Sequence, residues 1–225
     1  MRIKKTFSPT IARHTRAGAY LGIGTTCLEL PQESPRPILS RSRMESNAWL
    51  RRNAATMVGD VLSLGSRDDA DGEGGFYRRY FSRAGSYTTS DLLGEADLVL
   101  DIRDMSTVPD NRYNGIFCSG VLEHVDDFHR ALSEITRILA PAGTLLLGLP
   151  MRQAIHDAPG DFWRFTRFAV EYLLRDRYTV GEIAEIDKDP VTDFPAAYWV
   201  KAMKKVVQGS WFDKLTTNGP SSGFE

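Results

Sequence analysis

Cysteines and long apolar runs are scarce in this sequence, and neither sign of charge is in excess. The 225 residues include two cysteines, Cys27 and Cys118, whose spacing forms neither a disulfide framework nor a metal motif. No run approaches the ~20 apolar residues that span a bilayer. Lysine and arginine number 28 against 29 acidic residues, whereas nucleic-acid-binding proteins usually have a basic excess. We therefore expect a cytoplasmic protein, with no membrane and no nucleic acid among its partners.

Three regions of the chain differ in composition. Residues 1–42 are basic and then rich in glycine and proline, which is typical of an irregular arm or cap. Residues 43–208 contain the regular apolar patterns and are predicted to form one domain. Residues 209–225 are rich in serine, glycine and asparagine and are predicted to form a flexible tail. With 42% hydrophobic and 25% charged residues, the chain has enough apolar material for one sizeable core.

Short apolar runs alternate with helical patterns through the middle of the chain. The predicted strands are 61–64, 86–90, 98–100, 114–119, 144–149 and 180–186, and the predicted helices are 45–57, 76–81, 128–139 and 168–174. Such an alternation favours a parallel sheet that is covered by helices on both faces. Ligands of these α/β sheets bind at the carboxyl ends of the strands, near the point where the strand order reverses.

Four predicted strands end in residues that suit a nucleoside ligand. Gly65 follows the first strand and lets a ligand approach the backbone closely. Asp91 and Asp101 follow the second and third strands, where one carboxylate can accept from a ribose diol and the other from an exocyclic amine. Ser119 and Gly120 follow the fourth. The competing interpretation is that each aspartate is a turn or cap residue, and for Asp101 a loop residue paired with Arg103.

Two longer stretches resemble a known family. Residues 61–65, Val-Leu-Ser-Leu-Gly, resemble the first motif of class I S-adenosylmethionine-dependent methyltransferases. Residues 121–125, Val-Leu-Glu-His-Val, and 131–143 resemble the block that is typical of the type 11 subfamily. His156 and residues 159–166 resemble a further signature of certain bacterial members. The resemblance covers about residues 49–187, and its 122–143 block is the specific part.

The resemblance implies a Rossmann-like α/β fold with a mostly parallel seven-stranded sheet and helices on both faces. It also implies S-adenosylmethionine as the cofactor and a small-molecule acceptor as the partner, and we add a homodimer as an expectation. The implied cofactor-binding residues lie after successive strands: Gly65, Ser66 and Arg67; Asp91 and Leu92 at the ribose; Asp101 and Ile102 at the adenine; and Ser119 and Gly120 beside the sulfonium.

The first motif departs from the family pattern at three positions. Ser63 stands where an acidic residue is usual, and Arg67 and Asp69 stand where glycines are usual. These departures leave two alternatives to a methyltransferase open. One is a methyltransferase-like binding or regulatory protein without transfer activity. The other is an enzyme that binds S-adenosylmethionine but catalyses a reaction other than methylation.

The acceptor side of the site is predicted from histidines and a mixed aromatic and charged segment. His156 is our candidate for the catalytic base, because the ordinary pKa of histidine, ~6.5, suits proton transfer near neutral pH. Its alternative role is a hydrogen bond that fixes the loop to Asp157 or Asp161. His124 is predicted to bind substrate or to be structural. No histidine, cysteine or carboxylate cluster has the spacing of metal ligands, so no metal is predicted.

The segment that follows His156 has two interpretations of equal weight. Trp163 could form a wall of the acceptor pocket and Arg164 could bind an anionic group of the substrate. Alternatively, the aromatics pack under the sheet and Arg164 pairs with Asp161. The function that we predict is methyl transfer to a small polar molecule, with oxygen favoured as the accepting atom. Secondary metabolism or glycan assembly is the expected setting, by analogy with the family alone.

Overall fold

The computed structural model describes residues 40–94 and 96–206. Residues 1–39 of the predicted arm and the whole predicted tail, 209–225, lie outside the described residues. Within the described ranges no helix is both long and apolar enough to cross a membrane.

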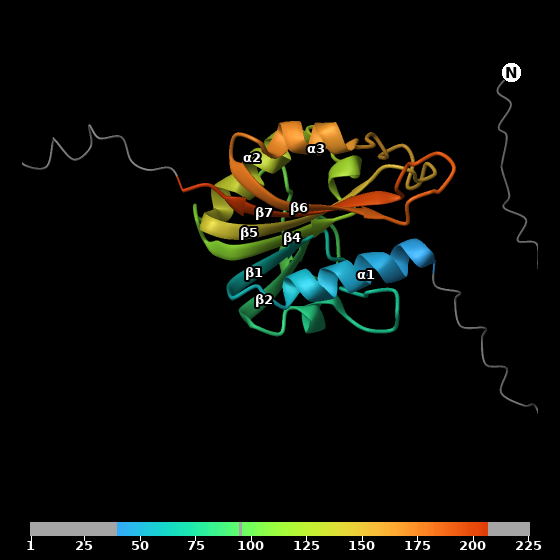
Figure 1. Cartoon of the computed structure of the whole chain (residues 1–225). Helices are drawn as coiled ribbons and strands as arrows, with labels where there is room; N and C mark the ends of the chain where they lie inside the picture. Colours follow the sequence, from blue (N-terminus) through green and yellow to red (C-terminus); the bar gives the residue numbers. More distant parts are fainter. Residues whose placement is uncertain (1–39, 95, 207–225) are drawn as a thin grey trace, which may run out of the picture. The chain divides into compact units, whose positions relative to one another are not determined.

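A seven-stranded sheet forms the centre of the fold, with the strand order β3-β2-β1-β4-β5-β7-β6 (Figure 1). Its strands are β1 (Gly59–Leu64), β2 (Ala84–Asp91), β3 (Leu98–Val99), β4 (Tyr113–Ser119), β5 (Leu139–Pro150), β6 (Tyr178–Ile186) and β7 (Ala197–Lys204). The first five strands pair in parallel, and β7 pairs antiparallel with both β5 and β6. The predicted mostly parallel seven-stranded sheet is confirmed.

The central strands are apolar because both of their faces are buried. In β1, Val61, Leu62 and Leu64 are at most 3% exposed, and their side chains alternate between two core clusters on opposite faces of the sheet. Leu145, Leu146 and Leu147 of β5 do the same. A continuous apolar run is therefore what a strand needs when helices or loops cover both of its sides.

Helices cover both faces, as predicted. In Figure 1, α1 (Arg41–Ala54) lies on one face of the sheet, and α2 (Phe128–Ile138) and α3 (Arg167–Leu174) lie on the other. Trp49 of α1 packs against Trp199 of β7, with ring centroids 5.5 Å apart, and its Nε1 donates to Glu182 of β6 at 2.9 Å. This contact fixes α1 across the antiparallel part of the sheet.

Three elements differ from the sequence prediction. The helix predicted over 76–81 is a single 3₁₀ turn, η1 (Tyr77–Tyr80). β5 begins at Leu139 rather than at Thr144, because Leu139 already pairs with Tyr113 before the register shifts. Ala142 has a φ of 60° within this irregularity, so the segment that reads as a helix stop is a bulged strand start. The last difference is β7, for which the residue pattern predicted no strand.

Candidate functional site

A cavity of about 790 Å³ opens at the carboxyl ends of the central strands. Leu64 of β1, Ser119 of β4 and Pro150 of β5 all lie at its wall, because these strands are parallel and therefore end at the same edge of the sheet. The first turn of α1 adds Ser42 and Arg43 to the lining. The cavity has the size of a typical site for a small molecule or a cofactor.

The loop after β1 has left-handed backbone at three successive odd-numbered positions, of which only the first is a glycine. Gly65, Arg67 and Asp69 have φ values of 66°, 46° and 60°, so the two positions where the family usually has glycine are left-handed here as well. Left-handed backbone costs a non-glycine residue about 1–2 kcal/mol. Aspartate tolerates it better than most residues, and arginine does not share that advantage. Arg67 and Asp69 therefore adopt backbone angles that glycine would adopt at a lower free-energy cost.

The buried carboxylate of Asp69 holds that loop in place. Its Oδ2 accepts from the Arg78 Nε at 2.9 Å and the backbone amide of Arg78 at 3.2 Å, and its Oδ1 accepts from the Tyr87 hydroxyl at 2.8 Å. Burial raises the pKa of the Tyr87 phenol, and the neighbouring Asp69 raises it further, so this hydroxyl remains a donor. Hydrogen bonds to a charged group contribute about 1.5–3 kcal/mol each, which offsets the backbone strain.

Gly65 is required by its surroundings as well as by its φ. A Cβ at this position would overlap with the Cγ2 atom of Val121, which lies in the loop after β4. The loops after β1 and β4 therefore approach each other at a point where no side chain fits. A ligand in the cavity meets bare backbone there, which is the kind of surface that a cofactor needs for close contact.

We expect Gly65→Ala to lower the free energy of unfolding by at least about 2 kcal/mol, from left-handed strain and overpacking together. Urea unfolding would measure the loss. In Gly65→Ala/Val121→Ala the overlap is relieved and only the backbone strain remains, so the double variant should recover about 1 kcal/mol or more. If Val121→Ala gives no recovery, the close approach of the two loops is not the reason for the glycine.

Asp91 connects β2 to the same loop. Its Oδ2 accepts from the Arg67 amide and its Oδ1 from the Leu93 amide, both at 3.0 Å. Each carboxylate oxygen has a second lone pair for another donor. Asp91 and the exposed Leu92 lie beside the cavity rather than in its lining. The ribose role predicted for them stays a prediction, and the free lone pairs fit it.

Asp101 and Ile102 are also outside the cavity lining. Both carboxylate oxygens of Asp101 accept from the Arg103 guanidinium, at 3.0 and 2.8 Å, and Arg103 in turn reaches Asp126 at 2.9 Å. The hydrogen bonds from Arg103 lower the pKa of Asp101. This contact is the loop pairing that the alternative interpretation described, and the adenine role stays a prediction.

The predicted cofactor residues after β1 and β4 come together in the cavity. Gly65, Ser66 and Arg67 line it from one side, and Ser119 and Gly120 line it from the end of β4. The combination of a bare backbone cradle, a carboxylate at the end of β2 and a cavity of suitable volume fits S-adenosylmethionine.

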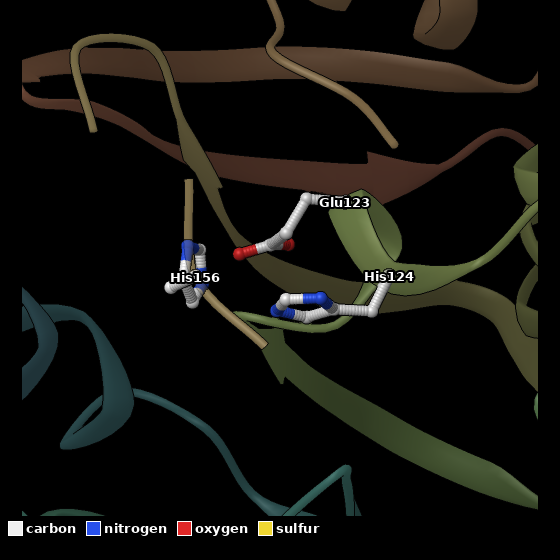
Figure 2. A group of neighbouring side chains, drawn as sticks. All are labelled: Glu123, His124 and His156. Atoms are coloured by element: carbon white, nitrogen blue, oxygen red, sulfur yellow. The ribbon is translucent and has the colours of Figure 1, made fainter. Parts of the chain in front are cut away.

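Glu123, His124 and His156 line the cavity from the segments after β4 and β5, and their side chains point toward one another (Figure 2). Glu123 and His124 belong to the 3₁₀ turn η2 (Leu122–His124), and His156 lies in the loop after β5. The two imidazole rings are 4.8 Å apart between centroids, at an angle of 84°. Glu123 is 2% exposed, and burial raises the pKa of its carboxyl group.

Backbone oxygens orient both histidines. The Nδ1 atom of His124 lies 2.8 Å from the Gly160 carbonyl, and that of His156 lies 3.2 Å from the Ala154 carbonyl. A carbonyl can only accept, so Nδ1 is the donor in both rings, and Nε2 is the nitrogen with the lone pair when the ring is neutral. Among the described residues neither Nε2 atom has a hydrogen-bond partner.

Trp163 and Arg164 do not line the cavity. The Trp163 Nε1 donates to the Val125 carbonyl at 2.8 Å. Arg164 forms a bidentate ion pair with Asp161, at 2.6 and 2.8 Å, and this pair lowers the pKa of Asp161. Asp161 also accepts from the His156 amide at 2.9 Å, so Arg164 supports the loop that holds His156. Their predicted contacts with substrate stay predictions.

Sequence reasoning missed Glu123 and the cations of the cavity wall, Arg43 and Arg152. Glu123 belongs to a recognised motif, but a glutamate beside an apolar run reads as a surface residue. The signal that could have singled it out is its place directly after the Ser119–Gly120 strand end.

Comparison with known sequences identifies the middle of the domain. Residues 74–147 match the family described as "Methyltransferase domain". Among curated protein sequences, none matches this chain.

Solved structures of methyltransferases share the fold. One is 1,6-didemethyltoxoflavin-N1-methyltransferase from Burkholderia thailandensis with S-adenosylhomocysteine, which is 16% identical with a TM-score of 0.54 over 76% of this chain and 92% of that one. Another is the N-methyltransferase NodS from Bradyrhizobium japonicum with S-adenosylhomocysteine, at 17% identity and a TM-score of 0.55 over 78% and 90%. A third, from Aquifex aeolicus, is 18% identical with a TM-score of 0.52 over 73% and 92%.

Proposed function

We propose that the chain is a class I, S-adenosylmethionine-dependent methyltransferase and that it methylates an oxygen atom of a small polar acceptor; the match of residues 74–147 to a methyltransferase domain supports this. One observation supports this most directly. The cavity lining combines a backbone cradle in the loop after β1 with two imidazoles and a buried carboxylate in the segments after β4 and β5. An acceptor between the cradle and the imidazoles would lie next to both a methyl donor and a proton acceptor.

The residues of the chain have separate tasks in this reaction. The cofactor supplies an activated methyl group when it is bound. The loop of Gly65 to Arg67 and Asp91 would hold it, and Ser119 and Gly120 would align the acceptor with it. His156 would accept the proton from the acceptor hydroxyl at Nε2. Its loop is fixed by Asp161 and Arg164, so its position is defined before substrate binds.

We propose secondary metabolism or glycan assembly as the setting of the reaction, by analogy with the family that the chain resembles. The cavity volume suits a small acceptor, and two of the solved neighbours are named as methyltransferases of nitrogen. We favour oxygen because an alcohol must lose a proton to become a good nucleophile, and this site offers a base. We place the protein in the cytoplasm, which suits the buried free thiol of Cys118. The homodimer stays a prediction.

The test combines cofactor titration with the mass of the product. We expect calorimetry of the full chain to give saturable, micromolar binding of S-adenosylmethionine and S-adenosylhomocysteine. A screen of small alcohols, phenols and amines should then give a product heavier by one methyl group. Cofactor binding without a methylated product from any acceptor would favour a binding protein. A product of unchanged methyl content would favour a different reaction, and no binding to folded protein would contradict the proposal.

A further inference from the structure

Glu123, His124 and His156 form a compact set of donor atoms. One donor atom of each lies within 4.8 Å of the other two (Figure 2). Donors at the usual distance of about 2.0–2.2 Å from a zinc ion lie roughly 3.3–3.6 Å apart in a tetrahedral site. Side-chain rotations that move each atom by about 1 Å would therefore close the set around one ion.

The outer contacts of the two histidines are those of metal ligands. A histidine that binds a metal almost always donates its other ring N–H to a carbonyl or carboxylate, which orients the ring. His124 does this with the Gly160 carbonyl. His156 does it with the Ala154 carbonyl, and the carboxylate of Asp161 lies 3.3 Å from the same Nδ1. Both rings are thus held with Nε2 as the atom that can bind an ion.

Glu123 gives an independent reason to expect a cation here. Its side chain is 98% buried by relative area, since only 2% is exposed, and its Oε2 atom has no hydrogen-bond partner among the described residues. A buried polar atom without a partner costs about 1–3 kcal/mol, and more when it is charged. The nearby guanidinium of Arg164 already forms two hydrogen bonds with the Asp161 carboxylate. A cation held between Glu123 and the two histidines would satisfy this carboxylate of Glu123.

We propose that Glu123, His124 and His156 bind one divalent transition-metal ion of the zinc type. Two imidazoles and one carboxylate suit such an ion, whereas Mg²⁺ and Ca²⁺ prefer oxygen ligands only. All three residues line the cavity, so an ion that they hold would lie at the cavity wall, within reach of an acceptor in the cavity.

The ion would change how the acceptor loses its proton. This step rests on the proposed function, although binding of the ion does not. A bound ion would act as a Lewis acid that lowers the pKa of an acceptor hydroxyl, and the proton of that hydroxyl would leave to water. The O–C bond to the methyl group then forms as the C–S bond of the cofactor breaks. His156 is the base in the ion-free protein, and its Nε2 lone pair is held by the ion in the loaded protein.

Cobalt is the probe of choice because Co²⁺ at nitrogen and oxygen ligands absorbs visible light. The full chain would be stripped with a chelator and titrated with CoCl₂ by absorbance, and with ZnCl₂ by calorimetry. We expect one ion per chain with saturable absorbance. Changing an outer partner of a metal ligand already costs about 10–100-fold in affinity, so Glu123→Gln and His156→Ala should each lose more than about 100-fold. His129→Ala, in which an exposed imidazole of α2 is removed, should bind the ion normally.

Folding and cofactor binding are measured on the same samples. Far-UV circular dichroism shows whether each variant folds, and the partly exposed His156 makes His156→Ala the safer variant. Titration with S-adenosylhomocysteine reports on the proposed function separately, so a failure of one proposal leaves the other standing. Absence of a saturable cobalt signal in folded protein, or unchanged affinity in both folded ligand variants, would overturn the metal site.

Discussion

Asp91→Ala is expected to weaken S-adenosylmethionine binding by about 10²–10⁴-fold. The carboxylate would accept two hydrogen bonds from the ribose hydroxyls, and each such bond to a charged group contributes about 1.5–3 kcal/mol. Together they amount to about 3–6 kcal/mol, and every 1.4 kcal/mol changes the dissociation constant about tenfold. Asp91 also accepts from the Arg67 amide, so its loss would loosen the loop that contacts the cofactor. Isothermal calorimetry measures the change.

Two other variants separate ribose binding from loop positioning. Asp91→Asn keeps one oxygen for the Arg67 amide and loses one acceptor, so its affinity should fall between those of wild type and alanine. Asp176→Ala removes an acidic side chain that is 82% exposed and far along the sequence from the cavity loops, and it should bind normally. Wild-type affinity in a folded Asp91→Ala protein would remove the ribose role and place the cofactor elsewhere in the cavity.

The sheet was predictable wherever burial on both faces demands apolar residues. The strands around Leu62, Ile116 and Leu146 are central, and each is an apolar run that ends in a turn. The segment of β7 was missed because Lys201 and Lys204 interrupt its apolar run, while its pairing with β5 and β6 is a long-range contact that local pattern does not encode. The start of β5 was misplaced for a related reason, since only its pairing with Tyr113 makes Leu139 part of a strand.

Residues of the candidate site were predictable where their place in the cavity follows from the ends of the strands alone. Gly65, Ser119 and Gly120 lie in the cavity because strand ends meet at one edge of a parallel sheet. Side-chain partners were not predictable, because Asp101 and Arg164 each had a functional and a structural interpretation. In the structure each of these side chains forms an ion pair: Asp101 pairs with Arg103, and Arg164 pairs with Asp161.

The effect of the departures in the first motif could not be predicted from residue types, because it depends on the backbone angles of Arg67 and Asp69. Arg67 and Asp69 suggested a weakened cradle, yet both residues have the left-handed φ that glycine would adopt. Asp69 adds an anchor that glycine could not provide, through Arg78 and Tyr87. A motif can therefore lose its glycines and keep its geometry when a buried side chain stabilises the strained loop.

His156→Ala is expected to lower kcat for an alcohol acceptor by about 10²–10⁴-fold, the usual contribution of a general base. The affinity for S-adenosylmethionine should stay within about twofold of wild type, because the predicted cofactor contacts lie on the loops after β1, β2, β3 and β4. The split between kcat and cofactor affinity distinguishes His156 from Asp91, whose loss should act on affinity first. Single-turnover kinetics with saturating cofactor would measure the methyl-transfer step directly.

Two control experiments test whether the loss of activity comes from the imidazole of His156. His129→Ala removes an exposed histidine of α2 and should leave kcat unchanged. Added imidazole should restore part of the activity of His156→Ala in chelator-treated protein, because a small base can enter the space that the side chain leaves. If His156→Ala keeps the wild-type kcat, the histidine only fixes the loop between Ala154 and Asp161, and the acceptor loses its proton without it. If His156→Ala lowers kcat only in metal-loaded protein, and chelator-treated wild type and His156→Ala have the same kcat, the ligand role of His156 accounts for the effect, because no ion remains to be lost after chelation.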